Sequence, residues 1–192
     1  MNVADAEIIE QIRKGKKHLF AALIDRYKAR GMTLALGMLK VREEAEEALA
    51  DAFIRAYNGL DRFEGASGFG TWFYRILYNV CLSRLGKRKG AFTRVDLDDE
   101  TGYVTANEGT SPDAIKELEA KEKRETIARI IRQMPEKYAV MLTMFYLEEL
   151  SHAEICEVTG MPLGTVKIRL SRARAIIMKE LKKEFHEERI HV

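Results

Sequence analysis

The stretch that decides the fold runs from Ser151 to Lys183 and reads "SHAEICEVTGMPLGTVKIRLSRARAIIMKELKK". Ser151 and Glu154 have the spacing of a capping box, which opens a helix, and Gly160 suits the residue that follows a helix end. Pro162 then opens a second helix. A short capped helix, a tight turn and a basic helix together predict a helix-turn-helix.

The second of these helices is strongly basic, because residues 164–183 hold seven Lys or Arg residues and a single acid, Glu180. At ~100° per residue one face of this helix is apolar, and that face must pack on the preceding helices. The apolar stripe consists of Val166, Leu170, Ala173, Ile177 and Leu181. The opposite face carries Ile168, Ser171, Arg172, Ala175, Lys179 and Lys182, with Lys167 at its border.

We expect the N-terminal part of this basic helix to lie against base edges in a major groove, as in other helix-turn-helix proteins. The residues predicted to contact duplex DNA are Thr165, Lys167, Ile168, Arg169, Ser171, Arg172 and Arg174. Lys179, Lys182 and Lys183 are expected to contact phosphates or to be solvated. The alternative is that the whole face is merely a solvated surface, and the capped helix and tight turn before it argue against this.

Composition favours helices throughout the chain. The 192 residues include only three prolines, 46% are apolar and 32% are charged. We therefore expect an all-α protein of two small helical domains joined by a flexible acidic linker. No run approaches the ~18 apolar residues of a membrane span, and the N-terminus lacks the pattern of a signal peptide. A cytoplasmic protein is the expectation.

The two cysteines, Cys81 and Cys156, lie far apart and have no Cys or His neighbours at metal-ligand spacing. We interpret them as reduced thiols, with a redox switch as the alternative. The four histidines form no ligand pair on one helix face, so neither a metal nor a cofactor is expected.

Charge divides the chain into three parts. Residues 1–90 hold 16 Lys or Arg against 11 Asp or Glu, residues 91–120 hold 2 against 8, and residues 121–192 hold 14 against 11. Periodicity is lost between residues 91 and 110, where "DLDDETGYVTANEGTS" is typical of a linker. We therefore predict a domain over residues 1–90, a linker over 91–111 and a second domain over 112–192, whose first helix runs to about residue 132. After Pro135 the strongly apolar "EKYAVMLTMFYLEEL" predicts another helix of this domain. Two basic parts around an acidic middle suit a partner of polyanions.

The N-terminal part contains aromatic residues interleaved with basic ones. A Gly-rich loop, "DRFEGASGFG", precedes a helix that begins near Thr71 and reads "TWFYRILYNVCLSRL" before the basic "GKRKG". Aromatic side chains among cations suit single-stranded nucleic acid, because every unstacked base offers a face for stacking. The alternative is that these aromatics form the core, which we favour for Phe73 and Ile76 and leave open for Trp72.

Both halves together resemble an extracytoplasmic-function (ECF) sigma factor of bacterial RNA polymerase, over roughly residues 7–90 and 112–183. The stretch "EEAEEALADAFIRAY" looks like the family's polymerase-docking helix, and "DRFEGASGFGTWFYRILYNVCLSRL" looks like its minus-ten segment. The C-terminal "MPEKYAVMLTMFYLEELSHAEICEVTGMPLGTVKIRLSRARAII" is similar to the reader of the minus-thirty-five element. We expect no further regulatory domain after this reader.

The resemblance implies residue roles. Core polymerase would contact Glu47, Asp51, Phe53, Arg55 and Tyr57. The minus-ten element would contact Arg62, Phe63, Phe69, Thr71, Trp72, Arg75, Asn79, Arg84, Lys87 and Arg88. The minus-thirty-five element would be read as duplex, one minus-ten base would be flipped into a loop pocket, and the acidic linker would thread towards the polymerase channels. The implied partners are core RNA polymerase (its beta and beta-prime subunits), promoter DNA and an anti-sigma protein, which in this family is often membrane-bound.

Two other classes of protein remain as alternatives. An ordinary helix-turn-helix regulator would explain residues 130–185 but not the aromatic and basic N-terminal part. An enzyme is the weaker alternative, since the chain has no P-loop, no Gly-x-Ser-x-Gly, no His-Glu-x-x-His and no Cys–His pair at ligand spacing. We therefore expect no catalytic residues.

Overall fold

A computed structural model describes residues 3–89, 126–127, 129–131 and 133–188 of the chain. Within these ranges the chain is helical and contains no strand, which confirms the all-α prediction. The linker predicted over residues 91–111 and most of the helix predicted over 112–132 lie outside the described residues. No helix in the described part is long and apolar enough to cross a membrane.

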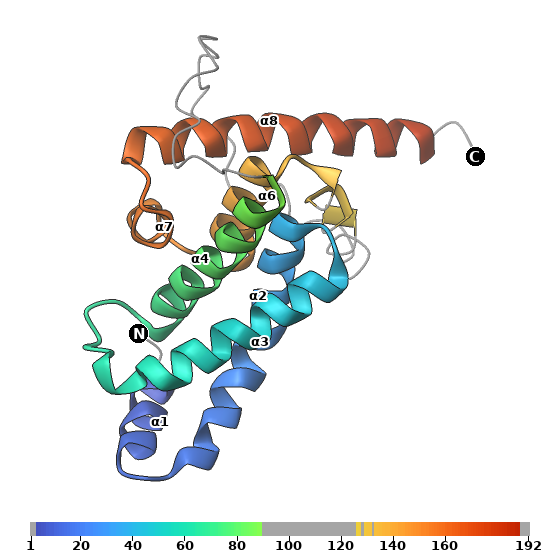
Figure 1. Cartoon of the computed structure of the whole chain (residues 1–192). Coiled ribbons are helices and arrows are strands. Elements are labelled where there is room, and N and C mark those ends of the chain that lie inside the picture. The colour runs from blue at the N-terminus through green and yellow to red at the C-terminus, as the bar shows by residue number, and fades with distance from the viewer. Residues whose placement is uncertain (1–2, 90–125, 128, 132, 189–192) are drawn as a thin grey trace.

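The N-terminal lobe, residues 3–89, is built on three long helices that lie side by side (Figure 1). Its elements are α1 (Val3–Arg13), η1 (Lys17–Leu19), α2 (Phe20–Leu39), α3 (Arg42–Gly59), η2 (Leu60–Arg62) and α4 (Phe69–Lys89). The short α1 packs at the end of the lobe where α2 begins and α3 ends. Between η2 and α4 runs the loop of residues 63–68.

Small residues let α3 pack closely on its neighbours. Ala45, Ala48, Ala52 and Ala56 follow helical spacing and are fully buried. On the same side of the helix Phe53 stacks on Phe73 of α4, with ring centroids 4.5 Å apart. Burial of such aromatic rings supplies much of the free energy that holds a small helical core together.

The C-terminal lobe, which we define as residues 126–188 where described, contains the predicted helix-turn-helix. Its elements after residue 135 are α6 (Glu136–Leu142), η4 (Thr143–Leu147), α7 (His152–Thr159) and α8 (Leu163–Glu188). The capping box is present, because Ser151 Oγ accepts from Glu154 N and Glu154 Oε2 accepts from Ser151 N at 2.9 Å. Gly160 ends α7 with φ +71°, in the left-handed region that favours glycine.

One element of this lobe differs from the prediction. The pattern after Pro135 predicts a single α-helix through Leu150, whereas α6 ends at Leu142 and a five-residue π-helix, η4, follows. The wider turn of a π-helix shifts the residues after it around the axis. It leaves Glu148 buried and pointing at the other lobe, as described below.

The two lobes are in contact. Helix α4 lies against α7, and α2 lies against α6 and η4. One continuous cluster of buried apolar side chains includes residues of both lobes, from Leu23 and Phe73 to Met141 and Val166. Lys40 Nζ at the end of α2 also donates to the carbonyl of Met134 at 2.7 Å.

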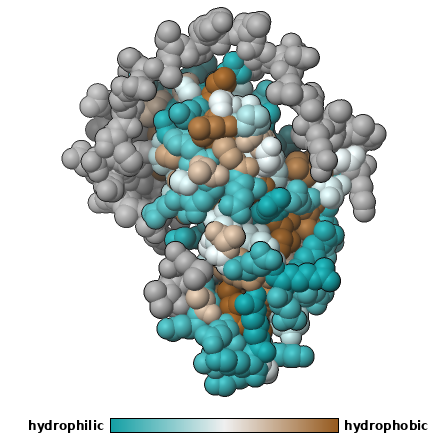
Figure 2. Space-filling view, turned by 90° about the vertical axis from the view of Figure 1, so that its left-hand side faces the viewer, coloured by the Kyte–Doolittle hydropathy of each residue, from teal (hydrophilic) through white to brown (hydrophobic). Residues whose placement is uncertain are grey.

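The hydropathy of the surface differs between the two ends of the molecule in the view of Figure 2. Hydrophilic side chains dominate the end of the molecule where α1 and the start of α2 lie, and hydrophobic side chains reach the surface near mid-height. The large apolar residues exposed in the described part are Ile54, Tyr57, Leu163, Ile168 and Met178. Four of these five lie on α3 or near the start of α8, the two helices predicted to carry binding surfaces.

Candidate nucleic-acid and polymerase interfaces

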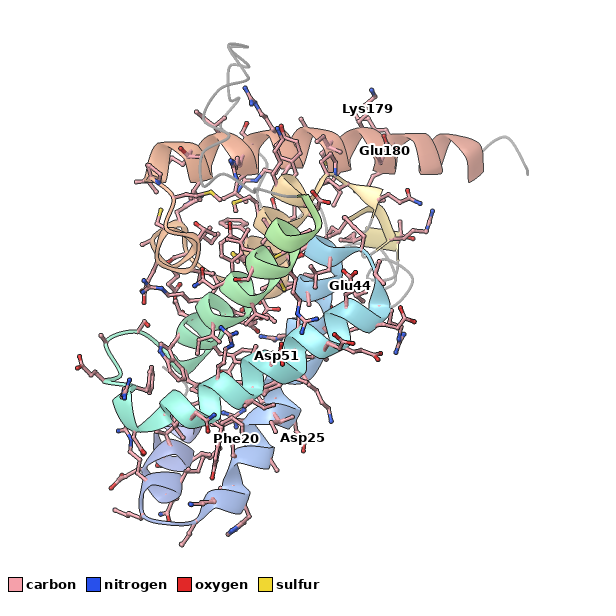
Figure 3. All side chains as sticks on the ribbon, in the orientation of Figure 1. Phe20, Asp25, Glu44, Asp51, Lys179 and Glu180 are labelled. Carbon is pink, nitrogen blue, oxygen red and sulfur yellow. The ribbon has the colours of Figure 1, made fainter. Side chains whose placement is uncertain are left out.

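The outward face of α8 is the candidate interface for duplex DNA. The predicted inward stripe is confirmed, because Val166, Leu170, Ala173 and Ile177 are buried and Leu181 is half-buried. On the opposite side Ile168 is 54% exposed and Lys167 is exposed beside it. Lys179 points away from the body of the molecule in Figure 3. The basic face is thus accessible along α8.

The remaining residues predicted at this interface are less exposed. Thr165, Ser171 and Arg172 are half-buried at the edges of the outward face. Arg169 Nη1 lies 3.3 Å from Met161 Sδ. Arg174 is held within its own lobe, with its guanidinium 5.0 Å from the Phe145 ring centroid, a cation–π contact. Arg174 is therefore placed to stabilise the domain, while Arg172 lies at the edge of the outward face.

The candidate minus-ten surface is built on an aromatic cluster at the start of α4. The rings of Phe63 and Phe69 are buried and meet edge to face, with centroids 6.0 Å apart. The half-buried Trp72 packs on both rings, 5.0 Å from Phe63 and 5.7 Å from Phe69. Gly59 makes room for the indole, since a Cβ there would lie 3.3 Å from it. Trp72 is thus both a core residue and an accessible ring.

Polar residues extend this surface along α4. Trp72, Arg75 and Asn79 recur at a spacing that places them on one face of a helix, and Arg75 and Asn79 are exposed. Arg62 is exposed at the other end of the loop. The side chains of Lys87 and Arg88 lie outside the described residues. Thr71 is buried and donates to Glu154 Oε1 of the other lobe at 3.0 Å, so it is engaged between the lobes.

The candidate polymerase interface lies on α3. Arg84 of α4, which was predicted to contact DNA, forms hydrogen bonds to two residues of this interface. Arg84 of α4 donates to Glu47 at 2.8 Å and to Asp51 at 2.6 Å, and these two hydrogen bonds raise the pKa of Arg84. Figure 3 shows Asp51 on α3. Arg84, predicted at the DNA, is therefore paired with two residues that were predicted at the polymerase.

The exposed part of α3 differs in detail from the sequence prediction. Phe53 is buried in the stack with Phe73, so its side chain belongs to the core. Arg55 and Tyr57, two of the residues predicted to contact polymerase, are exposed, and Ile54, which was not singled out, is 60% exposed. The spacing of the alanines could have identified Ile54 as exposed. Ala52 and Ala56 define the inward face of α3, and Ile54 lies on the opposite side.

A buried carboxyl group between the lobes was also missed. Glu148 is 7% exposed and accepts a hydrogen bond from the Tyr74 hydroxyl, and its Oε1 has no hydrogen-bond partner among the described residues. Burial raises the pKa of Glu148 to about 7, although the Tyr74 bond and the charge of Arg30 act in the opposite direction. Burial, together with the Glu148 carboxylate, likewise raises the pKa of Tyr74.

The cysteines form no disulfide. Cys81 is buried in the core, Cys156 is half-buried, and both are free thiols. Burial raises the pKa of Cys81 to about 12, which suppresses the reactive thiolate. Among the described residues no group of three His, Cys, Asp or Glu side chains is arranged to hold a metal ion.

Each of the two lobes matches a known protein family. The sigma-70 region 2 family matches residues 23–90, and the sigma-70 region 4 family matches residues 124–177. The ECF RNA polymerase sigma factor SigW of Bacillus subtilis is 35% identical over 183 residues, which cover 91% of this chain and 95% of SigW. The chain belongs to the ECF sigma factors of the sigma-70 family.

Other relatives and solved structures agree. The RNA polymerase sigma-H factor of Pseudomonas aeruginosa is 32% identical over 92% of this chain and 93% of its own length, and the ECF sigma-E factor of Escherichia coli is 30% identical over 91% and 93%. CnrH, solved with the cytosolic domain of CnrY, shares the fold with a TM-score of 0.59 at 18% identity, covering 94% of this chain and 98% of that one. The sigma factor RpoE of Bartonella quintana, solved with the anti-sigma factor NepR, has a TM-score of 0.60 at 20% identity, with coverages of 85% and 96%.

Family membership decides against an ordinary helix-turn-helix regulator. The region 2 match covers the aromatic and basic N-terminal lobe, which an ordinary helix-turn-helix regulator does not explain. The chain is therefore a sigma factor, a transcription initiation factor that directs RNA polymerase to promoters.

Proposed function

We propose that the outward face of α8 reads the minus-thirty-five element as duplex, with Lys167, Ile168 and Arg172 nearest the bases. The single observation that carries this assignment is the 54% exposure of Ile168 between basic residues, directly opposite the buried Val166 stripe. An exposed isoleucine suits the methyl group of a thymine, and an arginine can donate two hydrogen bonds to a guanine. Lys179 and Lys182 lie farther along the helix and contact phosphates.

The loop of residues 63–68 and the exposed face of α4 capture unpaired minus-ten bases. Trp72 offers a ring at the edge of the aromatic cluster, and the exposed Arg75 and Asn79 follow it on the same face of α4. Arg62, which precedes the loop, is exposed as well. Extruding a base from a duplex costs a few kcal/mol, and stacking on an aromatic side chain returns ~1–3 kcal/mol per base. The exposed part of the indole can therefore offset much of the cost of promoter melting.

Helix α3 docks on core RNA polymerase. Its exposed side carries Ile54, Arg55 and Tyr57, and Glu47 and Asp51 lie on the side that faces Arg84. Exposed apolar residues beside charged ones are typical of a protein–protein interface, where the apolar groups are buried on binding. The residues that carry the two binding roles thus occupy two neighbouring helices of one lobe.

An anti-sigma protein holds the chain inactive. The support for this regulation is the likeness in fold to CnrH and to the Bartonella RpoE, the latter solved with an anti-sigma factor. The domain division at residues 90 and 112, with the acidic linker running through the polymerase, belongs to the same proposal. It is supported by the two family matches, which leave residues 91–123 between them.

Run-off transcription on a library of genomic promoter fragments tests the proposal. Core RNA polymerase with the chain should produce transcripts from a defined subset of fragments that share two upstream elements, and core polymerase alone should not. Transcripts that do not depend on the added chain, or a chain that fails to bind core polymerase in gel filtration, would refute it. The recovered promoters also supply the DNA probes for the experiments below.

A further inference from the structure

Helix α1 lies outside the region that the sigma-70 families match, yet two of its side chains reach the candidate minus-ten site. The region 2 match begins at residue 23, whereas α1 spans Val3–Arg13. Ile9 and Ile12 are buried and anchor α1 on the N-terminal lobe. The two polar residues in question are Asp5 in its first turn and Arg13 at its end.

Arg13 holds the chain where the loop of residues 63–68 begins. Its Nη2 donates to the carbonyl oxygen of Leu60 at 2.8 Å and also to that of Phe63. Leu60 is the first residue of η2, and Phe63 is the residue that ends it. The Phe63 ring in turn packs 5.0 Å from the Trp72 ring. One guanidinium nitrogen of Arg13 therefore holds the backbone at the start of the loop. Through the backbone of Phe63 it also helps to position the ring that packs on Trp72.

Asp5 holds the other end of the loop through Tyr27. The Asp5 carboxylate is buried, accepts from Arg26 Nη1, and accepts from the Tyr27 hydroxyl at 2.6 Å. The Tyr27 ring lies directly against the first turn of α4, since a Cβ added to Gly70 would be 3.0 Å from Tyr27 Cε1. The same ring also contacts Phe69, with centroids 5.3 Å apart. The orientation of Tyr27 thus determines where α4 can begin.

The loop between these two supports has few constraints of its own. Glu64, Gly65 and Ala66 are exposed, and Gly65 has φ +74°, which a side chain rarely adopts. A pocket that captures a base must be held in place by residues whose own positions are locked by packing and hydrogen bonds. Such a loop is precise only if its two ends are fixed. Helix α1 supports the first end directly through Arg13 and the second end indirectly through Tyr27.

We propose that α1 positions the minus-ten loop, with Arg13 and Asp5 as positioning residues for the capture of an unpaired promoter base. This inference rests on the proposed function of the loop. Neither residue touches DNA in this proposal. Arg13 acts through the carbonyls of Leu60 and Phe63, and Asp5 acts through Tyr27.

The test compares Arg13→Gln with Lys14→Gln in full-length holoenzyme. Both changes remove one positive charge, but Lys14 is exposed and pairs with Glu10 on its own helix, their Nζ and Oε1 atoms 2.5 Å apart. The probes are a single-stranded oligonucleotide of the minus-ten element from a recovered promoter, a panel of oligonucleotides with one base changed, and the minus-thirty-five duplex. Affinity for core polymerase and the thermal unfolding midpoint of the free chain are measured in parallel.

We expect Arg13→Gln to weaken single-strand binding roughly tenfold, the equivalent of one lost stacking contact, and to flatten preference across the panel. Binding to the duplex and to core polymerase should stay at the Lys14→Gln level. Arg13→Lys, whose ammonium can donate to the same two carbonyls, should restore part of the affinity and preference. Tyr27→Phe, which removes the hydrogen bond to Asp5 but keeps the ring, should shift single-strand binding in the same direction.

Two results would overturn the inference. One is wild-type single-strand affinity and preference in Arg13→Gln. The other is a parallel loss of single-strand, duplex and core binding, which would show that α1 only stabilises the fold. If Arg13→Gln does not fold, the same criteria apply to Arg13→Lys and Tyr27→Phe. Failure of the wild-type chain to bind core polymerase would instead refute the proposed function.

Discussion

Tyr74 of α4 donates a hydrogen bond to the buried carboxyl group of Glu148, which follows η4 in the other lobe. The contact joins residues 74 positions apart in the sequence. A second cross-lobe bond, from Thr71 to Glu154, lies one helical turn earlier on α4. Helix α4 is thus held against the C-terminal lobe by two acidic side chains.

The first prediction is that the contact between the lobes weakens as the pH rises. The pKa of Glu148 is about 7 when the lobes are closed and returns to its ordinary value when they separate. The closed form therefore binds the proton more tightly, so closure is strongest below the ordinary carboxyl pKa and is lost as pH rises through about 7. Small-angle X-ray scattering of the free chain should show a larger radius of gyration at pH 8 than at pH 5.5.

The matched variant for this prediction is Glu148→Gln, which cannot titrate and keeps an acceptor for Tyr74. It should remove most of the dependence on pH. The groups that face Glu148 are Tyr74 on α4 and Arg30 on α2. Burial and the Glu148 carboxylate raise the pKa of Tyr74, so its hydroxyl keeps its proton between pH 5.5 and 8. A dependence on pH that persists in Glu148→Gln would show that another group causes it and would contradict the assignment to Glu148.

The second prediction concerns Trp72 and the melting of DNA. Trp72→Ala should slow promoter opening roughly tenfold or more, because stacking is worth ~1–3 kcal/mol per base, and should weaken the closed complex less. Trp72→Phe keeps an aromatic ring and should retain most of the opening rate. Opening can be followed by the fluorescence of 2-aminopurine placed in the minus-ten element.

Circular dichroism must accompany these rates, because Trp72 also packs on Phe63 and Phe69. Loss of helical signal in Trp72→Ala would assign the indole to the core alone. Equal opening rates for the wild type and a folded Trp72→Ala would contradict the stacking role.

The third prediction concerns the exposed residue on α3 that the sequence analysis did not single out. Ile54→Glu should weaken binding to core polymerase by ~1–3 kcal/mol, the usual cost of losing a large apolar contact at an interface. Stability of the free chain should change little, since the side chain is 60% exposed. Fluorescence anisotropy with labelled core polymerase measures the affinity, and Asn58→Asp, a change at another exposed position of α3, is the control. Unchanged affinity in Ile54→Glu would remove Ile54 from the docking surface.

Local chemistry explains which parts of the fold could be predicted. The capping box at Ser151, the left-handed Gly160 and the buried stripe that begins at Val166 each depend on residues within a few turns of one another. Such patterns are visible in a sequence because the partners are near in the chain. The polymerase-docking and minus-ten roles of the N-terminal lobe could be predicted only from the resemblance of its sequence motifs to those of the family.

The contacts that were missed join distant residues. Arg13 reaches Phe63 across 50 positions, and Tyr74 reaches Glu148 across 74. Neither pair has a spacing rule, because tertiary packing alone brings the partners together. The π-helix η4 was missed for a related reason, since the apolar run that contains it fits an ordinary α-helix equally well. The helical periodicity of α8 places Arg174 next to the apolar stripe that begins at Val166. It cannot show that the Arg174 guanidinium stacks on the Phe145 ring.

The last prediction separates base contacts from phosphate contacts on α8. Arg172→Ala should cost ~1–3 kcal/mol and relax preference at one base pair of the minus-thirty-five element, as loss of a bidentate contact to guanine does. Lys182→Ala should weaken all sequences alike and reduce the slope of binding against salt by about one unit, as loss of a phosphate contact does. Both residues lie on the outward side of the helix, but only Arg172 lies within its first turns.

The assay for these two variants is binding of holoenzyme to a panel of single-base changes in the minus-thirty-five element at several salt concentrations. Lys179→Ala should behave like Lys182→Ala, because Lys179 is also exposed on the outward face and has the same proposed phosphate contact. The orientation of α8 follows from the burial of Val166 and Leu170, which leaves Ile168 and Arg172 on the outward face that we propose to read DNA. If Arg172→Ala kept every base preference while Lys182→Ala changed them, α8 would have to enter the groove by its C-terminal half, and the assigned reading face would be wrong.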